Sequence, residues 1–354
     1  MTRETPRITC DNLDIAIEEH EQRGFRLEMI FPADSPREAL MSRGDELVGL
    51  MSEPPASAGG KASEVDPTLL SAETLKAHEF GPPAYAGGSD SEWTIGRAGM
   101  QYRDLIPGRL GGKVIASHIR LPFGGEVPDS VHYHKIDFQI IYCVRGRIQV
   151  VYEDQGPPFW LETGDLVLQP PEIRHRVLYS DAGAEVIEVS SPAEHETWID
   201  HEMKLPNDAL EPDRHFEGQG FLHFKGGGGE PYIGSGYSQI ETGAWEKSGH
   251  RISILIKSFV DRDNNSRTRG WFVGDSSFEF VYVLAGNLKI VESEGLPNSF
   301  RPGESFAEGS SFVLQNSTAF TFDWSPDLKL LHILMPTENG KDRHRFLDDA
   351  GQYI

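Results

Sequence analysis

Short apolar segments separated by turns rich in glycine, proline and aspartate dominate the chain from about residue 92 onward. Examples are "KVIASHIRLP", "FQIIYCV" and "AEVIEVS", in which apolar side chains recur at every second position or run together. This pattern is typical of strands, because successive side chains of a strand point to opposite faces. Many short strands with closely spaced turns indicate a β-sandwich or a closed barrel. We therefore predict a mainly β fold for this part of the chain.

Residues 1–52 follow a different pattern and predict a small α+β module. A strand "RITC" precedes a helix "DNLDIAIEEHEQRG", with Asp11 or Asn12 as its N-cap and Gly24 at its end. The strands "FRLEMIF", "REALMS" and "ELVGLM" follow, so the predicted order is β-α-β-β-β. This order resembles one module of the vicinal-oxygen-chelate (glyoxalase) superfamily, whose metal sites take histidine and glutamate ligands from paired modules. Here there is one module and its first strand has no histidine, so we expect a structural or dimerising role.

An internal repeat divides the rest of the chain. The segment "FQIIYCVRG" at 138–146 recurs as "FEFVYVLAG" at 278–286, and "LVLQP" at 166–170 recurs as "FVLQN" at 312–316. Repetition of this kind indicates two copies of one domain. We place the copies at 92–205 and 206–340, after a Pro-, Gly-, Ala- and Ser-rich linker at 53–91 and before a tail at 341–354.

Composition narrows the classes of function. The formal net charge of −22 over 354 residues argues against binding to nucleic acid or to anionic membranes. The two cysteines, Cys10 and Cys143, stand far apart, and Cys143 lies in an apolar strand, so no disulfide framework is indicated. No segment has the apolar length of a membrane-spanning helix or the apolar core of a signal peptide. We expect a soluble, cytoplasmic protein.

Two histidines one residue apart open the segment "VHYHKIDFQIIYCVRG" at 131–146. On a strand, His132 and His134 point to the same face and can share one metal ion. Such a pair also occurs on solvated strands, so the pair alone leaves both interpretations open. His175 follows in "GDLVLQPPEIRH". Three imidazoles in one barrel interior without an ion would leave buried polar nitrogens unpaired, at a cost of about 1–3 kcal/mol each, which favours metal binding.

The spacing of these residues resembles the two motifs of the cupin superfamily. Its first motif is glycine, five residues, H-x-H, three or four residues, glutamate, six residues and glycine; the second is glycine, five residues, P-x-G, two residues, histidine, three residues and asparagine. The matching positions are His132, His134, Gly146, Gly164, Pro170 and His175. The resemblance covers both repeats and implies a bicupin, with two double-stranded β-helix (jelly-roll) barrels.

Four positions depart from these motifs. Gln139 stands in place of the first-motif glutamate, Glu172 in place of the second-motif glycine and Tyr179 in place of its asparagine, while Gly125 lies one residue farther from His132. The family ligands then reduce to three histidines, with Gln139 as an optional fourth ligand or as a hydrogen-bond donor beside the ion. The resemblance implies one divalent transition metal, with Fe2+ favoured over Zn2+, Mn2+ or Ni2+.

The second copy lacks these ligands. Phe272 and Gly274 align with His132 and His134, Thr321 falls near the place of the third histidine, and Glu279 stands where the first copy has glutamine. We expect a degenerate, metal-free barrel that serves packing or dimerisation.

Strand alternation also predicts which side chains line the pocket. Ile141 and Cys143 share the side of Gln139, and Val177 and Tyr179 share the side of His175. These four residues would form a wall with apolar and hydrogen-bonding groups, and Tyr179 could donate to a bound oxyanion.

His118 and Arg120 share one face of the strand "VIASHIRLP". If that face is the barrel interior, Arg120 can bind a substrate carboxylate and His118 can act as acid or base. An outward face in contact with water is the alternative. A further acidic segment with two histidines, "EHETWIDHE" at 194–202, is interpreted as a solvated crossover.

A bicupin with one active barrel and three histidines resembles ring-cleaving dioxygenases of the gentisate and salicylate type. The resemblance implies an Fe(II) dioxygenase that acts on a small aromatic or enolic acid. A metal-dependent isomerase, lyase or hydrolase and a non-catalytic ligand-binding protein remain as alternatives, because a fold does not choose between them. Since exposed sheet edges need covering, we also expect a homodimer.

Overall fold

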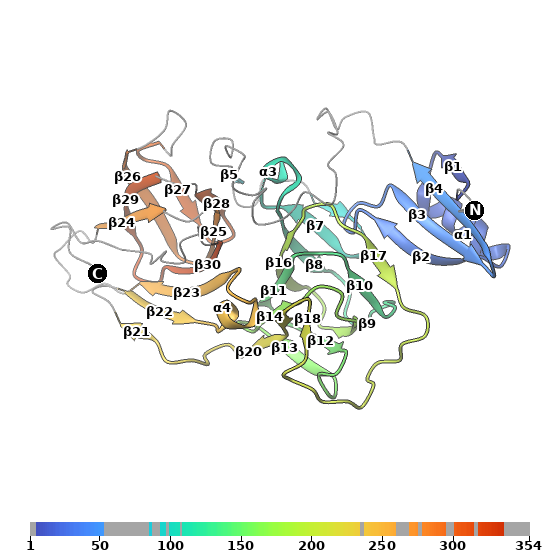
Figure 1. The fold of residues 1–354 in the computed structure, drawn as a ribbon. Coiled ribbons are helices and arrows are strands. Elements are labelled where there is room, and N and C mark those ends of the chain that lie inside the picture. Colours follow the sequence, from blue (N-terminus) through green and yellow to red (C-terminus); the bar gives the residue numbers. More distant parts are fainter. Residues whose placement is uncertain are drawn as a thin grey trace.

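The computed structural model describes residues 5–52, 85–86, 93–96, 99–106, 108–233, 237–259, 269–274, 278–294, 301–314 and 318–335. The predicted linker lies outside these residues except for Tyr85–Ala86, and the predicted tail lies wholly outside them. Three units follow one another in space: an N-terminal module, a central barrel and a C-terminal barrel (Figure 1). None of the helices in the described ranges is long and apolar enough to span a membrane.

The N-terminal module has the predicted β-α-β-β-β order. Its elements are β1 (Arg7–Cys10), α1 (Leu13–Gln22), β2 (Arg26–Phe31), β3 (Glu38–Arg43) and β4 (Glu46–Ser52). Asn12 is the N-cap of α1, because its side chain accepts a hydrogen bond from the backbone N–H of Ile15 at 3.0 Å. Gly24 adopts a positive φ of 84° after the helix, where other residues would be strained. The helix packs on the sheet over a core that includes Met41 and Leu50.

The central barrel consists of two facing sheets. Its elements are β6 (Thr94–Ile95), β7 (Gln101–Asp104), α3 (Arg109–Gly112), β8 (Ile115–Leu121), β9 (Gly125–Glu126), β10 (His132–His134), β11 (Phe138–Arg145), β12 (Arg147–Tyr152), β13 (Phe159–Glu162), β14 (Leu166–Gln169), β15 (His175–Ser180), β16 (Ala184–Ser191), β17 (Thr197–Ile199), β18 (His215–Phe216), β19 (Gln219–Gly220) and β20 (Leu222–Phe224). One sheet has the order β17-β10-β15-β12-β13 and the other β20-β14-β11-β16-β8-β7-β6. Apolar side chains from both sheets fill most of the space between them.

The C-terminal barrel repeats this plan. Its elements are β21 (Tyr232–Ile233), β22 (Tyr237–Glu241), α4 (Ala244–Lys247), β23 (Ser253–Phe259), β24 (Arg269–Gly274), β25 (Phe278–Ala285), β26 (Asn287–Glu294), β27 (Ser305–Ala307), β28 (Ser311–Leu314), β29 (Thr318–Trp324) and β30 (Lys329–Met335). The pairing of β11 with β16 shifts register between Cys143 and Arg145, and that of β25 with β30 shifts between Val283 and Ala285. The same irregularity at the same place in both copies supports the internal repeat.

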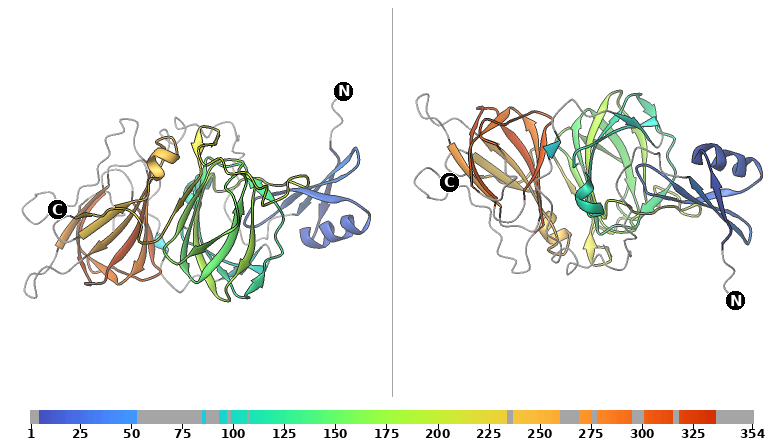
Figure 2. Two further views of the ribbon diagram at one scale, coloured as in Figure 1. Left: turned by 90° about the horizontal axis from the view of Figure 1, so that it is seen from below. Right: turned by 90° about the horizontal axis from the view of Figure 1, so that it is seen from above.

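The three units share sheets as well as surfaces. Strand β2 pairs with β17, so the sheet of the N-terminal module continues into the central barrel. Strand β20 pairs with β14, although it follows the predicted boundary at 205/206, and β5 (Tyr85–Ala86) pairs with β28 of the C-terminal barrel. The two barrels lie side by side in both views of Figure 2, and one apolar core that includes Ile140 and Phe280 joins them.

Candidate metal centre

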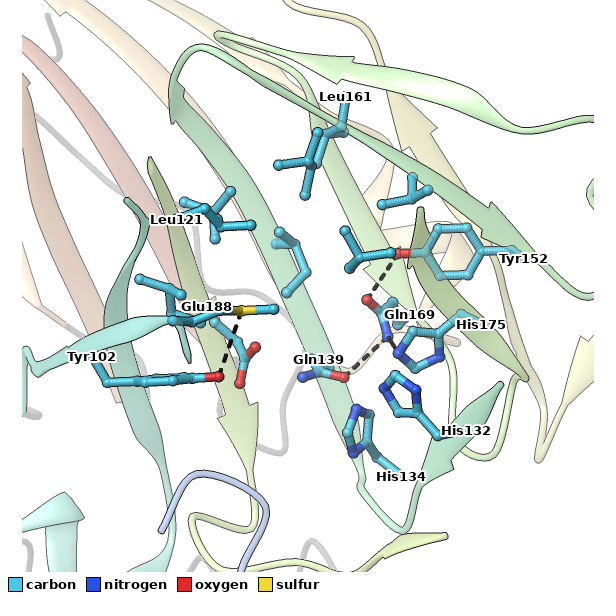
Figure 3. A pocket seen from close by; sticks show the side chains of 17 residues that line it. Tyr102, Leu121, His132, His134, Gln139, Tyr152, Leu161, Gln169, His175 and Glu188 are labelled. Carbon is cyan, nitrogen blue, oxygen red and sulfur yellow. Dashed lines mark hydrogen bonds between the residues drawn. The ribbon is translucent and has the colours of Figure 1, made fainter. Parts of the chain in front are cut away.

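Three histidines meet inside the central barrel. His132 and His134 lie on β10 and His175 opens the neighbouring strand β15, where it pairs with His132. Their ring centroids lie 4.3 to 5.2 Å apart, and one nitrogen of each lies within 4.8 Å of the others. All three side chains are buried, and Figure 3 shows them grouped at one end of a pocket. The structure therefore brings together the three predicted metal ligands.

The outer nitrogens of these imidazoles are held by hydrogen bonds. Each Nδ1 has an oxygen partner: Ser130 O for His132 at 2.7 Å, Thr197 Oγ1 for His134 at 2.8 Å and Ile173 O for His175 at 3.0 Å. The two backbone oxygens can only accept, so His132 and His175 donate from Nδ1. A neutral imidazole that donates from Nδ1 carries its lone pair on Nε2. This is the arrangement in which protein partners orient histidine ligands toward a metal ion. The donor set thus fits a divalent transition metal, and three imidazoles leave coordination positions for other ligands.

A chain of hydrogen bonds runs alongside the histidines. The Tyr152 hydroxyl donates to Oε1 of Gln169 over 2.9 Å, and Nε2 of Gln169 donates to Oε1 of Gln139 over 3.0 Å. The same Gln169 nitrogen lies 3.3 Å from Nε2 of His175. Burial, and after it the charge of Glu188, raise the pKa of Tyr152, so its hydroxyl keeps its proton and acts as a donor. Whether Gln139 binds the metal directly stays a prediction.

A cavity of about 70 Å³ opens beside the histidines. Its wall is mostly apolar, as predicted, and both Ile141 and Val177 line it. Four polar residues that the sequence analysis did not identify also line it: Tyr152 and Gln169 near the histidines, Tyr102 of β7 and Glu188 of β16 (Figure 3). The cavity has room for a small organic molecule and two distinct polar regions to bind it.

The expected interior placement of His118 and Arg120 is wrong. They share a face of β8, as alternation predicts, but the cavity is lined by Ile119 and Leu121 of the opposite face. Arg120 Nε donates to Glu185 over 2.9 Å, and its guanidinium lies over Trp93 at 4.3 Å. These contacts hold both residues on the side of β8 away from the cavity.

His118 has a defined place in this outer group. Arg103 donates to its Nδ1 over 2.8 Å, and its Nε2 lies 2.8 Å from a Glu185 oxygen. Because a guanidinium can only donate, His118 is neutral and donates from Nε2 to Glu185. Burial lowers the pKa of His118, whereas the hydrogen bond from His118 and then Arg120 hold the pKa of Glu185 at about 2. The group stabilises the region between the barrels, where the ring of Tyr282 packs against His118.

Two further pocket predictions are wrong in placement. Cys143 is buried in the interior core, but its thiol lies near backbone oxygens at Arg145 and Gly146 and does not line the cavity. Tyr179 is 41% exposed and packs edge-on against Trp160. The register of β12 with β15 shifts between Gln149 and Val150, so that one extra residue of β15 reverses the alternation after Val177.

The segment 194–202 is not simply a solvated crossover. His195 is buried, and its ring lies 5.3 Å from that of His134, while Thr197 holds the Nδ1 of the same ligand. His201 instead approaches Leu27 O of the N-terminal module at 2.9 Å. The paired strand β17 explains these contacts, because it connects the module to the histidine strand β10.

The C-terminal barrel holds a different set of polar residues. Thr321 occupies the place of His175, as predicted. Trp271 pairs with Thr321 as His132 pairs with His175, so Trp271 takes the place of His132, one residue before the predicted Phe272. Glu279 pairs with Leu314 on β28, whereas Gln139 pairs with Gln169 on β14.

The interior of this barrel contains ionisable residues. Glu279, His332 and Lys257 are all completely buried, and His332 Nε2 lies 3.0 Å from Glu279. Burial lowers the pKa of Lys257, and the charge of Glu279 opposes this shift. Among the described residues, His132, His134 and His175 form the cluster that could hold a metal ion. The metal-free state of the second barrel stays a prediction.

Comparison with known proteins identifies the fold. No family model matches the sequence, and no curated protein matches it. A mutant of Bacillus subtilis oxalate decarboxylase OxdC superposes with a TM-score of 0.53 and 14% identity over 77% of this chain and 81% of that chain. Protein YlbA from E. coli, of the family model DUF861, superposes with a TM-score of 0.52 and 13% identity over 77% of this chain and 99% of that chain. The chain has a mainly β bicupin fold with one three-histidine cluster in its described residues.

Proposed function

We propose that this bicupin is an Fe(II)-dependent dioxygenase acting on a small aromatic or enolic acid. In this proposal His132, His134 and His175 hold one divalent transition metal ion, with Fe2+ favoured over Zn2+, Mn2+ and Ni2+. The observation that carries it is the cluster of three buried histidines, without a carboxylate among them, opening onto a small and mostly apolar cavity. Neutral ligands leave the full charge of the ion available to bind an anionic substrate.

The residues of the chain have separate roles in this proposal. Bound Fe2+ would supply the redox chemistry that dioxygen needs, and its open positions would accept substrate and oxygen. Ser130, Thr197 and Ile173 orient the imidazoles through Nδ1. Ile141 and Val177 contribute to the apolar wall, which excludes water from the substrate. Gln139 lies beside the histidines as an optional fourth ligand.

Metal content and oxygen consumption test this proposal. We expect one metal ion per chain, and none in the His132→Ala/His134→Ala/His175→Ala variant. The variant His215→Ala, which changes an exposed histidine, is the control. The Fe2+-loaded protein should consume oxygen with at least one hydroxylated aromatic or diketone acid. Unchanged metal content in the triple variant would refute the site, and turnover of the same substrate without oxygen would refute the dioxygenase.

A metal-dependent lyase or isomerase is the second candidate, and Glu188 favours it. Its carboxylate lines the cavity together with Tyr102, so a group able to accept and return a proton stands beside the substrate site. Proton transfer at a metal-bound carboxylic or enolic acid needs no oxidant. Anaerobic turnover that requires metal and is lost in Glu188→Gln would favour this candidate, whereas tight ligand binding without any turnover would favour a non-catalytic binding protein.

We also propose that the protein forms a homodimer, because the N-terminal module leaves β1 at the end of its sheet. Light scattering at micromolar concentration should give about twice the chain mass of 39.4 kDa. A particle of the chain mass would refute the dimer.

A further inference from the structure

The segment 193–199 forms one side of the surroundings of His134. Strand β17 of this segment pairs with β10, and Thr197 stands opposite His134 in the pairing. The hydroxyl of Thr197 hydrogen-bonds to Nδ1 of His134 over 2.8 Å, and the ring of His195 packs edge-on against that of His134, with the centroids 5.3 Å apart. Both His195 and Thr197 are buried. The position of this segment therefore contributes to the orientation of the His134 imidazole.

The N-terminal module holds the same segment from the other side. Strand β17 lies between β10 and β2 in one continuous sheet (Figure 1), with Thr197 opposite Ile30 of β2. Just before this strand, Arg37 of the module donates from Nη2 to both carboxylate oxygens of Glu194, at 3.0 Å each. Thr197 thus pairs with the module through its backbone, while its side chain contacts His134.

A second contact connects the module to this segment through α3. Arg109 donates to both carboxylate oxygens of Asp34, at 2.5 and 3.4 Å, and Asp34 lies between β2 and β3 of the module. The Arg109 and Asp34 side chains are 23% and 15% exposed. Arg109 and Leu110 have positive φ angles of 49° and 50°, which strain residues other than glycine, so this turn depends on its contacts. The same turn reaches the start of the segment, because Gly112 O accepts from the backbone N–H of Ala193 at 3.0 Å.

These contacts connect the docking of the module with the binding of metal. Partners that orient a histidine ligand through its outer nitrogen change metal affinity about 10- to 100-fold. Thr197 can orient His134 only while β17 itself is held in place, and the module supplies one of the two strands that flank β17. Coupling of this kind is reciprocal: if the docked module favours metal binding, bound metal favours the docked module to the same extent.

We infer that the N-terminal module sets the metal affinity of the central barrel, with Arg37 and Asp34 as positioning residues that act on His134 through the segment 193–199. The module is then part of the structure that holds the metal, although the three histidines all lie in the central barrel. This inference rests on the proposed metal centre and is independent of the reaction that takes place there.

Variants of the full-length protein test the inference with Co2+ as the probe. We expect Arg37→Ala/Asp34→Ala to raise the dissociation constant for Co2+ at least about tenfold and to change the visible spectrum at saturation, because His134 loses its fixed orientation. The matched control is Arg43→Ala/Glu46→Ala, which removes an exposed ion pair between two residues of the module. A role in stability alone would lower the free energy of unfolding and leave the affinity and spectrum of the folded protein unchanged.

Exchange of charges between Arg37 and Glu194 gives an independent test. Arg37→Glu puts a like charge beside Glu194 and should weaken Co2+ binding, whereas Arg37→Glu/Glu194→Arg should recover most of the wild-type affinity. The reciprocal effect is measured by hydrogen exchange in the wild-type protein. Co2+ should slow the exchange of the β2 amides more than that of the α1 amides, since β2 pairs with β17.

The outcomes separate the inference from the proposed function. Equal affinity and an equal spectrum in wild type and in a folded Arg37→Ala/Asp34→Ala variant would overturn the inference, while Co2+ binding keeps the metal centre. If that variant does not fold, equal slowing of exchange in β2 and α1 would overturn the inference instead. Failure of the wild-type protein to bind Co2+ would overturn both. A lowered affinity in a protein that consumes no oxygen with any substrate would support the inference and remove the dioxygenase alone.

Discussion

Gln169 donates from Nε2 to Oε1 of Gln139 over 3.0 Å, so the two amides beside the histidines point in one direction. Tyr152 determines that direction, because its hydroxyl donates to Gln169 and holds the carbonyl end of that amide. Without this bond both amides could turn over. Which end of the Gln139 amide faces the cavity therefore depends on Tyr152, a residue of β12 in the facing sheet.

The variant Tyr152→Phe removes the donor that begins this chain. We expect the free energy of unfolding to fall by about 1–3 kcal/mol, because the buried Gln169 oxygen loses its partner. Chemical denaturation followed by fluorescence measures this change. Tyr179→Phe is the control, since Tyr179 is half-exposed and should change stability little. Equal stabilities for wild type and Tyr152→Phe would show that the bond does not hold the amide.

The variant Gln139→Glu replaces an amide oxygen beside the histidines with a carboxylate. We expect tighter metal binding, by about tenfold or more, because a carboxylate adds a charge that the amide lacks and Gln169 can still donate to it. Competition with a chelator of known affinity measures the effect. Unchanged affinity would place Gln139 outside the ligands of the metal. The variant Gln149→Glu is the control, because that residue lies on β12 and does not line the cavity.

The variant Thr197→Val removes the hydroxyl that hydrogen-bonds to Nδ1 of His134 while keeping the shape of the side chain. Losing a partner of this kind lowers metal affinity about 10- to 100-fold. The dissociation constant for Co2+ should rise accordingly, with stoichiometry still at one. Thr163→Val, at an exposed threonine of the same barrel, should leave the constant unchanged. The same affinity in both variants would mean that Thr197 does not orient the ligand.

Acid should weaken the contact between the two barrels, because Glu185 and His118 lie in this contact and both have lowered pKa values. The pKa of Glu185 is about 2 in the folded chain against 4.5 for the free group, so the unfolded chain takes up its proton first as the pH falls. The stability that this carboxylate contributes is present above pH 4.5 and is lost as the pH falls toward 2. The pKa of His118 is lowered too, so its contribution also decreases with acid, starting below 6.5.

The variant Glu185→Gln tests this acid dependence. It should be less stable than wild type at neutral pH, because Arg120 and His118 lose a buried partner. The difference in unfolding free energy should shrink by an amount on the order of 2 kcal/mol as the pH falls from 5 to 3. Denaturation at a series of pH values measures it, with Glu162→Gln as the exposed control. A constant difference would mean that Glu185 has an ordinary pKa.

Part of the site could be predicted from local spacing. His132 and His134 share a strand face by alternation alone, and the motif spacing added His175. Alternation also placed His118 and Arg120 on one face of β8, but it could not say which face. Both faces of this strand are buried, one by the cavity and one by the second barrel, so the apolar pattern of β8 does not distinguish inside from outside.

Other residues of the site depend on long-range pairing. The register of β15 changes by one residue after Val177, which turns Tyr179 outward, and a strand pattern does not reveal such an irregularity. Glu188 faces Tyr102 because β16 and β7 both flank β8, from distant parts of the chain. Alternation on "AEVIEVS" puts Glu188 on the side of Val186, a signal that would have identified it once one face of β16 was known to be interior.

Each barrel includes a strand that comes, along the chain, before the other barrel. Strand β5 comes before the central barrel in the chain and pairs with β28 of the C-terminal barrel, and β20 comes before the C-terminal barrel and pairs with β14 of the central one. A gene fragment that ends before β20 would leave β14 with an open edge, and one that begins after the central barrel would leave β28 without β5. Because β17 also pairs with β2, the smallest piece that can be inherited, transplanted or expressed with all its hydrogen-bonded strands contains all three units, and the barrel with the three histidines cannot be separated from the C-terminal barrel without loss.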